Sequence, residues 1–575
     1  MPSYVLGISG LYHDAAAVLL EDGKIVAAAQ EERFSRLKHD AALPVRAAQY
    51  CLETAGIPVS RVDWLVFYEK PLRKFERIVS TAVATFPRSW RSFPRQMHHW
   101  LGDRLWLRAN LTSAFGVSPE RMMFCEHHLS HAASAFYCSP HDEAAILCVD
   151  GVGEWATTSL WRGSGSAIEP VSEVRWPHSI GLFYSAITAH LGFAVNEGEY
   201  KVMGMAAYGQ PRFREEMSRL LRLDSEGGYS VDLDTFSWHW HPTEPATARL
   251  ARLLGPPRFP GTPFTPRLDP LAQHHADVAA SAQAATEEAL LHLVRHAHAA
   301  VPAPALCLAG GVALNAVCNG RIAAEGPHAH LWVQPAAGDA GGAMGAAMWA
   351  WHGVLGNPRG PALRSCALGR EVARDRTAEL LADLGARFDD LGDDAPERAG
   401  RDLAEGKVVA WVDGREEWGP RALGQRSILA DPRSAEVAER VNRSVKFREP
   451  FRPFAPSVRA GAAPRYFDIP AAAASTSRFM LSTHPVLPEA QAGLAAVTHV
   501  DGTARVQVVD ADTSPRFDRL LGAFEEATGV PVLLNTSFNL KGEPLVSTPV
   551  DALAAFARSD LDTLYLNGFR VERMR

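Results

Sequence analysis

Three histidines stand within five positions of the stretch "FCEHHLSHAASAFY", residues 124–137, among small and apolar side chains. The outer two, His127 and His131, are four residues apart, so on a helix both imidazoles project from one face and could hold one metal ion. His128 lies between them and would face elsewhere, which favours a supporting role. The alternative is a partly buried histidine pair without an ion. Further ligands elsewhere in the chain decide between the two.

Two aspartates supply carboxylates for such a site. Asp150, in "CVDGVGEW", and Asp339, in "AAGDAGG", each end a predicted strand, where side chains can enter a cleft. A mixed nitrogen and oxygen site suits Fe(II), Mn(II) or Zn(II) better than a thiolate-rich structural zinc does. The sequence therefore predicts a metal centre of these two aspartates with His127 and His131, with room for a substrate oxygen that the ion would polarise.

A second constellation lies near the C-terminus. The stretch "NRSVKFREPFRPFAPS" places Lys446, Arg448 and Arg452 on one loop or strand, alternating with aromatic residues. The stretch "LLNTSFNLKGEPL" adds Ser537 and Asn539 on alternate positions after an apolar strand. The K-x-R pair and the later S-x-N pair offer two cations and two neutral hydrogen-bonding groups. Such a set suits a polyphosphate together with a small polar carbonyl compound.

Further basic residues precede and follow these motifs. Arg421 and Arg426 lie in "REEWGPRALGQRSILADPR", and His499 and Arg505 lie in "THVDGTARVQ". So many arginines without matching acids predict an anionic ligand. The alternative is a solvated basic face, but its residues would rarely alternate with Phe, Pro and Trp.

The elements that must position these residues can be predicted from patterns of hydrophobicity. The stretch "YVLGISGLYHDAAAVLLEDGKIVAAAQEERF" predicts strand, polar turn, strand, Asp-Gly hairpin turn and strand, with His13 and Asp14 in the first turn. Residues 144–163, "AAILCVDGVGEWATTSLWRG", repeat that order in part. Two such units predict a duplicated α/β domain with a cleft between its halves.

Glycines mark two later junctions. "ADVAASAQAATEEALLHLVRHAHAA" predicts a long amphipathic helix, and "ALCLAGGVALNAVCNG" predicts a strand that ends at Gly310 and Gly311, with Asn315 shortly after. A strand, a glycine pair and a helix let the backbone approach a nucleotide, with helix N–H groups facing phosphate. Residues 336–347 form another glycine-rich strand-to-helix junction. The order of these motifs resembles the actin, sugar-kinase and chaperone-ATPase superfold.

Composition limits the class of protein. The 575 residues predict two to four domains, and we place a boundary in the Gly- and Pro-rich stretch 353–364, which gives domains of residues 1–355 and 356–575. The net charge of −7 argues against a nucleic-acid partner. No apolar run reaches the length of a membrane span, no signal peptide is recognisable, and the seven cysteines form no CxxC pair. We therefore expect a cytoplasmic protein that does not contact a membrane.

Several of these stretches together look like the signature of the NodU/CmcH family of O-carbamoyltransferases. They are "ISGLYHDAAAVL", "EERFSR", "HHLSHAASAF", "VDGVGEW", "GGVALN", "EEWGPRALGQRSILADPR", "KFREPFRPFAPS", "THVDGTARVQ" and "NTSFNLKGEPLVSTP". The resemblance covers essentially the whole chain. It implies an α/β fold in which a duplicated actin/sugar-kinase-like N-terminal domain, similar to the tRNA threonylcarbamoyl transferase, precedes a YrdC-like α/β C-terminal domain.

The resemblance also implies a division of chemistry. In YrdC-type domains carbamoyl phosphate and ATP, with Mg, give carbamoyl-adenylate, and the N-terminal domain would transfer the carbamoyl group to a small-molecule hydroxyl acceptor of a natural-product pathway. Lys446, Arg448, Ser537 and Asn539 match the K-x-R and S-x-N positions, and Arg421, Arg452 and Arg505 are expected partners of carbamoyl phosphate. In the family pattern His127, His131, Asp150 and Asp339 bind the metal, and iron is the expected ion.

Two assignments keep an alternative open. His13 is our candidate general base for the attacking alcohol, or else a turn residue that only donates a hydrogen bond. Lys201, in "EGEYKVMGMAAYG", would contact a phosphate or carbonyl group, or else form an ordinary salt bridge. The basic segment between Pro71 and Asn110 would lie beside the acceptor site, or else form a solvated helical face.

Rival functions predict other products. A kinase of the sugar-kinase superfold would leave the K-x-R and S-x-N residues without a role and would release ADP. A non-catalytic ATP switch or binding module would need no histidine-rich metal site and would turn nucleotide over slowly. The acceptor, whether sugar, polyketide or another antibiotic scaffold, is not identified by the sequence, and a homodimer is allowed.

Overall fold

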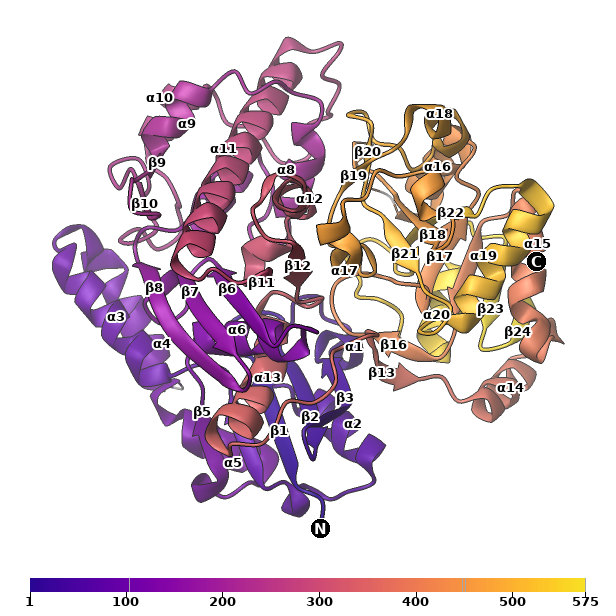
Figure 1. The fold of residues 1–575 in the computed structure, drawn as a ribbon, viewed down its shortest axis with the longest axis horizontal. Helices are drawn as coiled ribbons and strands as arrows, with labels where there is room; N and C mark the ends of the chain where they lie inside the picture. Colours follow the sequence, from indigo (N-terminus) through magenta and orange to yellow (C-terminus); the bar gives the residue numbers. More distant parts are fainter. Residues whose placement is uncertain (103, 447, 450, 574–575) are drawn as a thin grey trace.

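The computed structural model describes residues 1–102, 104–446, 448–449 and 451–573 of the chain. Figure 1 shows two lobes, of which the larger holds the N-terminal half and the smaller the C-terminal part. No helix within the described ranges is both long and apolar enough to cross a bilayer.

The N-terminal half contains two five-stranded sheets of the same strand order (Figure 1). In each sheet the first three strands are antiparallel and the last two run parallel to the first. The sheets are β3-β2-β1-β4-β5, formed by β1 (Tyr4–Ser9), β2 (Ala16–Glu21), β3 (Lys24–Gln30), β4 (Trp64–Phe67) and β5 (Met122–Phe124), and β12-β11-β6-β7-β8, formed by β6 (Glu143–Val149), β7 (Ala156–Ser164), β8 (Ala167–Arg175), β11 (Ala305–Ala309) and β12 (His330–Val333).

This topology confirms the predicted duplication. The predicted Asp-Gly turn lies between β2 and β3, where Asp22 and Gly23 both have positive φ, as a tight hairpin turn requires. The long predicted helix is α11 (Pro270–Ala300), which begins where the Asp269 carboxylate accepts a hydrogen bond from the Leu271 N–H. Asp150 lies directly after β6, one residue beyond the predicted strand end. Asp339 differs more from the expectation, because it is the first residue of a helix rather than the end of a strand.

Two helices join the sheets. α13 (Asp339–Met348) packs on β1 and β2, α6 (His127–Cys138) packs on β6 and β11, and the two helices pack on each other. The approach is close, because a Cβ at Gly345 would lie 1.7 Å from the Ser130 carbonyl oxygen and one at Gly7 would lie 2.1 Å from the Ala343 carbonyl oxygen. Glycines therefore set the spacing of the layers that carry the predicted metal ligands.

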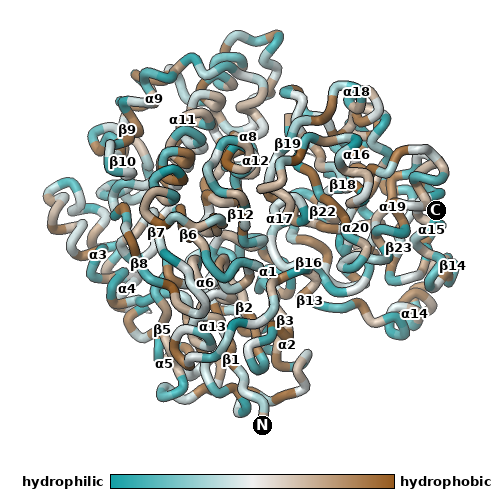
Figure 2. The backbone as a smooth tube through the Cα atoms, in the orientation of Figure 1, coloured by the Kyte–Doolittle hydropathy of each residue, from teal (hydrophilic) through white to brown (hydrophobic). Residues whose placement is uncertain are grey.

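The remaining elements of this half surround the sheets. They are α1 (Glu32–Ser35), α2 (Val45–Ala55), α3 (Pro71–Ala84), α4 (Phe93–Gly102), α5 (Leu107–Phe115), α7 (Ile180–His190), α8 (Glu199–Ala206), α9 (Arg214–Leu220), β9 (Leu221–Leu223), β10 (Tyr229–Val231), α10 (Ala248–Leu254) and α12 (Ala316–Glu325). Figure 2 shows hydrophobic residues along the inner strands and helices and hydrophilic ones at the surface.

The C-terminal part is built on an eight-stranded sheet of order β14-β24-β23-β15-β17-β22-β18-β21. Its strands are β14 (Phe388–Asp390), β15 (Val409–Val412), β17 (Arg426–Ala430), β18 (Ala455–Arg459), β21 (Gln507–Val509), β22 (Val532–Ser537), β23 (Thr563–Leu566) and β24 (Phe569–Glu572). The pairs β13 (Ala367–Glu371) with β16 (Arg415–Glu417) and β19 (His484–Pro485) with β20 (Thr503–Ala504) lie beside it, as do helices α14 (Arg374–Asp383), α15 (Ala395–Ala404), α16 (Ala435–Val441), α17 (Ala474–Ser477), α18 (Pro488–Gln491), α19 (Pro515–Thr528) and α20 (Pro549–Ala557).

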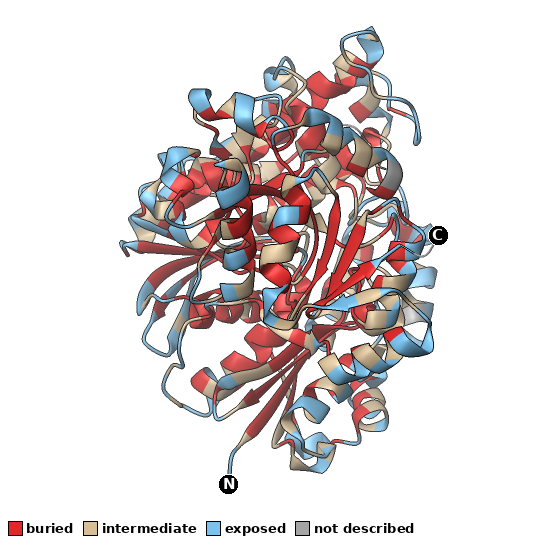
Figure 3. Cartoon of the chain, turned by 90° about the vertical axis from the view of Figure 1, so that its right-hand side faces the viewer, coloured by how far each residue is buried: buried red, intermediate tan, exposed pale blue. Residues whose placement is uncertain are grey.

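The C-terminal sheet has hydrophobic cores of its own on its two sides, and Figure 3 shows its strands as largely buried. Residues 356–366 form neither helix nor strand on the way to it. Trp418, Phe451 and Phe479 are buried in the hydrophobic cluster of the N-terminal half. The two parts are therefore in contact through apolar side chains.

Candidate functional site

The four predicted metal ligands converge where α6, α13 and the end of β6 meet. The Nε2 atoms of His127 and His131 lie 3.1 Å apart, and Asp150 Oδ2 lies 3.1 Å from the first and 3.8 Å from the second. Asp339 Oδ1 lies 3.7 and 3.8 Å from the same two nitrogens. One ligand atom from each residue lies within 4.8 Å of the others. The predicted cluster is thus assembled.

The chemistry of this donor set fits a divalent cation. Burial alone would lower the pKa of His127, but the carboxylates of Asp150 and Asp339 outweigh it and raise the pKa to about 9. Burial would raise the pKa of Asp150, but hydrogen bonds from the two imidazoles hold it well below its usual range. These charges attract a cation as they attract a proton, and the nitrogen and oxygen donors suit Fe(II), Mn(II) or Zn(II).

Residues that the sequence analysis missed support the ligands. The His127 backbone N–H donates to both carboxylate oxygens of Glu154 at 3.1 Å, and the Tyr68 hydroxyl donates to Asp339 Oδ2 at 3.3 Å. Glu69, next to Tyr68, binds the Lys74 ammonium at 2.7 Å. A signal was present in "FYEK", because polar residues directly after an apolar strand lie at the strand end that faces a cleft.

His128 has the supporting place expected of it. Its Nδ1 atom lies 2.7 Å from the Ser159 hydroxyl, which also accepts a hydrogen bond from the Trp161 indole. Burial and the nearby His127 lower the pKa of His128 to about 3. It is therefore a neutral residue that ties α6 to β7.

The turn between β1 and β2 brings His13 beside the metal ligands. His13 Nε2 lies 3.9 Å from Asp339 Oδ2, and its Nδ1 lies 2.9 Å from Asp14 Oδ2. Burial would lower the pKa of His13, but Asp339 and Asp14 outweigh it and raise the pKa to about 9. The His39 ring binds the second oxygen of Asp14 at 2.8 Å. In this arrangement His13 holds a proton at neutral pH.

The K-x-R and S-x-N residues also meet. Lys446 Nζ lies 2.6 Å from the Ser537 carbonyl oxygen, 3.0 Å from its hydroxyl and 2.8 Å from Asn539 Oδ1. Burial and then the neighbouring Arg448 and Arg452 lower the pKa of Lys446 well below its usual range. The Lys446 amino group is thus fixed in place beside the basic side chains of Arg448 and Arg452.

Four arginines gather beside Lys446. After burial, the groups that lower the pKa of Arg505 are Arg421, Arg448 and Arg452. Burial and Arg452 lower the pKa of Arg448 to about 9. The buried Nε atoms of Arg421 and Arg505 have no hydrogen-bond partner among the described residues. Because a cluster of buried cations repels itself, this place favours an anion of several charges.

The arginine cluster lies at the contact between the two parts of the chain. Arg421 reaches the Leu314 carbonyl oxygen at 3.5 Å, and the Arg452 guanidinium stacks on the Tyr200 ring at 4.4 Å. Lys201 binds the Glu449 carboxylate at 2.9 Å, so it forms the salt bridge that was its alternative. The loop that carries Arg452 therefore packs against α8 of the N-terminal half.

Arg426 and His499, which the sequence analysis assigned to the anionic ligand, do not lie in the arginine cluster. Arg426 is fully buried and donates to the backbone carbonyl oxygens of residues 370, 413, 414 and 425. His499 faces Asp501 at 3.6 Å and the ring of Tyr208. The sequence pattern cannot distinguish an arginine that faces a ligand from one that satisfies buried carbonyl groups.

The glycine pair lies beside the metal ligands. Gly310 has a φ of +90°, and a Cβ there would lie 2.2 Å from the Val149 carbonyl oxygen. The Gly311 N–H donates to Asp150 Oδ1 at 2.9 Å. Asn315 caps α12 by accepting a hydrogen bond from the Cys318 N–H, and its amide pairs with Gln283. These contacts give the three residues structural roles, and nucleotide binding stays a prediction for them.

The basic segment from Pro71 to Asn110 forms α3, α4 and α5, and α3 and α4 lie at the side of the larger lobe away from the C-terminal part (Figure 1). α3 starts next to Glu69, so its first turn lies near the metal ligands. Trp90 is 60% exposed and Phe86 is 72% exposed. The segment thus starts near the metal centre and leads to an exposed surface.

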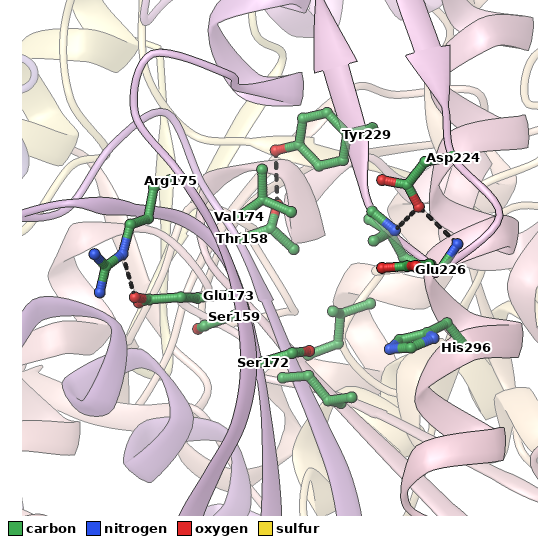
Figure 4. Close-up of a pocket in the computed structure, with 15 residues that line it drawn as sticks. Thr158, Ser159, Ser172, Glu173, Val174, Arg175, Asp224, Glu226, Tyr229 and His296 are labelled. Carbon is green, nitrogen blue, oxygen red and sulfur yellow. Dashed lines mark hydrogen bonds and ion pairs between the residues drawn. The ribbon is translucent and has the colours of Figure 1, made fainter.

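A cavity of about 360 Å³ lies elsewhere, between β7, β8, the β9–β10 hairpin and α11 (Figure 4). The Thr158 hydroxyl faces Tyr229 there at 2.9 Å, whereas the next residue, Ser159, faces His128.

The fold is thus an α/β fold that brings together one cluster of possible metal ligands and, apart from it, one cluster of buried basic side chains. The chain matches the family described as carbamoyltransferase N-terminus over residues 4–348 and the one described as carbamoyltransferase C-terminus over residues 400–573. It therefore belongs to the carbamoyltransferase family.

Individual relatives agree with this. The chain is 44% identical to an uncharacterized protein of Synechocystis sp., covering 99% of this chain and 96% of the relative. It is 39% identical to the nodulation protein NolNO of Sinorhizobium fredii, over 98% of this chain and 79% of the relative. It is 38% identical to the 3'-hydroxymethylcephem-O-carbamoyltransferase of Amycolatopsis lactamdurans, covering 43% and 44%. The predicted resemblance is confirmed at the level of the family, and the protein is a carbamoyltransferase.

Proposed function

We propose that this protein is an ATP-dependent O-carbamoyltransferase. It converts carbamoyl phosphate and ATP to carbamoyl-adenylate and transfers the carbamoyl group to a hydroxyl of a small molecule of secondary metabolism. The observation that carries this proposal is the presence of two assembled sites of different chemistry, one rich in buried cations and one rich in carboxylates and imidazoles.

The cationic site suits the adenylating half-reaction. Lys446, held by Ser537 and Asn539, presents a fixed ammonium, and Arg448, Arg452 and Arg505 would bind the phosphate groups of ATP and carbamoyl phosphate. In this half-reaction water first cleaves carbamoyl phosphate to carbamate and inorganic phosphate. A carbamate oxygen then attacks the α-phosphorus of ATP, and pyrophosphate leaves. Charges brought together in advance stabilise the negative charge that spreads over the phosphoryl oxygens.

The metal centre suits the transfer half-reaction. A divalent cation held by His127, His131, Asp150 and Asp339 would act as a Lewis acid toward a carbonyl or phosphoryl oxygen when bound, and iron is the ion we propose. The alcohol oxygen forms a bond to the carbamoyl carbon while AMP leaves, and the hydroxyl proton must be removed. His13 is the residue placed to hold that proton, by its Nε2 atom. Its raised pKa favours the protonated ring, so it acts as a base only after losing that proton.

We further propose that residues 1–355 form the actin/sugar-kinase-like transfer domain and residues 356–575 the YrdC-like adenylate-forming domain. A cytoplasmic location and the absence of nucleic-acid and membrane partners accompany this proposal. The exposed aromatic and basic side chains of the segment 71–110 would bind the acceptor.

Product analysis tests this function. The purified protein is incubated with ATP, magnesium, carbamoyl phosphate and a panel of hydroxyl compounds, and mass spectrometry follows both the nucleotide and the acceptor. We expect AMP, together with an acceptor heavier by one carbamoyl group. ADP with a phosphorylated acceptor would show a sugar-kinase-like phosphotransferase instead, and slow turnover that ignores carbamoyl phosphate would show an ATP switch.

A further inference from the structure

The stretch "EERFSR", residues 31–36, carries part of the family resemblance but has no role in the chemistry proposed above. In the structure it precedes and forms α1, a single helical turn that lies where the two parts of the chain meet (Figure 1). Glu32 and Arg33 are 8% and 4% exposed, although they are charged. Buried charged side chains need hydrogen-bond or ion-pair partners, and here these can come from either part of the chain.

Two arginines of this segment bind the C-terminal part of the chain. Arg36 Nη2 donates to the Pro544 carbonyl oxygen at 3.1 Å and Nη1 donates to that of Leu545 at 2.5 Å. Arg33 lies 3.3 Å from the Glu416 carboxylate and donates to the Gly419 carbonyl oxygen at 3.1 Å. The segment therefore holds two loops of the C-terminal part, one after Asn539 and one before Arg421.

The first of these loops leads directly to the cationic site. The Asn539 side-chain amide donates to the Glu543 carbonyl oxygen at 2.7 Å, next to the residue that Arg36 binds. The same side chain presents Oδ1 to Lys446 at 2.8 Å. Two hydrogen bonds through the Asn539 side chain therefore connect Lys446 to the loop of residues 540–545.

The same segment also leads to the metal centre. Arg36, at the end of α1, has a φ of +61° and donates its N–H to the Glu32 carbonyl oxygen. The Glu32 carboxylate accepts the His39 N–H at 2.9 Å, and the His39 ring binds Asp14 at 2.8 Å. Asp14 in turn binds His13, beside Asp339.

We infer that residues 32–39 link the two candidate sites, and that Arg36 is a positioning residue that transmits occupancy of the cationic site to the turn that carries His13 and Asp14. The inference rests on the proposed function, because it takes the anion bound by Lys446 and the arginines as the signal. It gives the protein a means to align the transfer site when the activated carbamoyl group is present.

Amide hydrogen exchange tests this link, with pyrophosphate and ATP with magnesium as the probes. In the wild type we expect each probe to slow exchange in residues 535–540, and also in residues 10–15 and 32–39 by about fivefold or more, the lower end of usual couplings between sites. In Arg36→Ala we expect slower exchange to remain in residues 535–540 and to be lost in residues 10–15 and 32–39. The Arg36 side chain is 29% exposed, so the variant is expected to fold.

Two further variants make the result specific. Arg46→Ala is the matched control, because the exposed Arg46 binds the Phe34 carbonyl oxygen from outside and makes its contact within the N-terminal half. It should behave as the wild type. Arg36→Lys keeps the charge but not the paired donors and should retain only part of the effect. Protection in residues 535–540 without any change in residues 10–15 and 32–39 of the wild type would overturn the link. No protection anywhere would instead count against the cationic site itself, and thus against the proposed function.

Discussion

At the scale of single residues, the proposed metal centre consists of side chains from three elements that meet at one point. Replacement of His131 by alanine removes a fully buried imidazole and leaves two carboxylates near one histidine. We expect His131→Ala to lose at least about tenfold in metal affinity, since even partners of metal ligands cost 10–100-fold. Elemental analysis of the purified variant, compared with the exposed-histidine control His330→Ala, checks this. An unchanged metal content in His131→Ala would remove the residue from the site.

Removing one charge from the arginine cluster is expected to stabilise the anion-free protein. Burial and Arg452 lower the pKa of Arg448 to about 9, so the charged form is disfavoured in the fold. Below about pH 9 Arg448 is protonated in both the folded and the unfolded chain. The full destabilisation of the folded state by the Arg448 charge is therefore present at pH 7. Arg448→Gln should therefore raise the Tm of the anion-free protein, by roughly 2–4 °C for each 1 kcal/mol gained.

The pH dependence and the effect of an anion follow from the same argument. Above about pH 9 the folded protein loses the Arg448 proton while the unfolded chain keeps it, so the wild type regains stability and its difference from the variant narrows. Pyrophosphate should raise the Tm of the wild type more than that of Arg448→Gln. Differential scanning calorimetry measures both. A variant that is less stable than the wild type without an anion would contradict the account.

At the scale of elements, the contact between α6 and α13 sets the distances between the proposed metal ligands. A Cβ at Gly345 would lie 1.7 Å from the Ser130 carbonyl oxygen, so alanine there forces the helices apart. Because His127 and His131 lie on one helix and Asp339 on the other, the ligands separate with them. Gly345→Ala should cost about 1–3 kcal/mol in the free energy of unfolding and weaken metal binding.

The control for this prediction is Gly461→Ala, because a Cβ at Gly461 meets no atom within 4 Å. Chemical denaturation gives the free energies, and a metal titration gives the affinities. Normal metal binding in a folded Gly345→Ala protein would mean that helix spacing does not control the site.

Much of the element order can be predicted from the sequence, because the patterns are local. The hairpin strands β1 to β3, the long helix α11 and the strand-to-helix junctions depend on hydrophobic periodicity and on turn residues within a few positions. The position of Tyr68 directly after an apolar strand indicates that it faces a cleft, but its partner Asp339 lies 271 residues later and no local pattern indicates that contact. The contact of Glu154 with the His127 backbone likewise joins different elements. The same holds for Arg36, whose partners lie more than 500 residues later.

At the scale of the whole molecule, two sites of opposite charge preference lie in two parts of the chain that share an apolar contact. The cluster of possible metal ligands could be predicted because His127 and His131 are spaced for a helix and because predicted strands lead to Asp150 and Asp339, which the family pattern also includes. The arginine cluster could be predicted as a group, but the exclusion of Arg426 needed the burial and the carbonyl partners that the structure shows. We propose that the cationic site forms the adenylate and that the metal site transfers the carbamoyl group, each independently of the other.

The most direct test of that claim needs no acceptor. The purified protein is incubated with ATP and magnesium, with and without carbamoyl phosphate, and the exchange of labelled pyrophosphate into ATP is followed in the wild type, in Lys446→Ala and in His131→Ala. We predict exchange that requires carbamoyl phosphate, is lost in Lys446→Ala and is retained in His131→Ala. Absence of exchange in the wild type, or its loss in both variants together, would contradict a separate adenylating site in the C-terminal part.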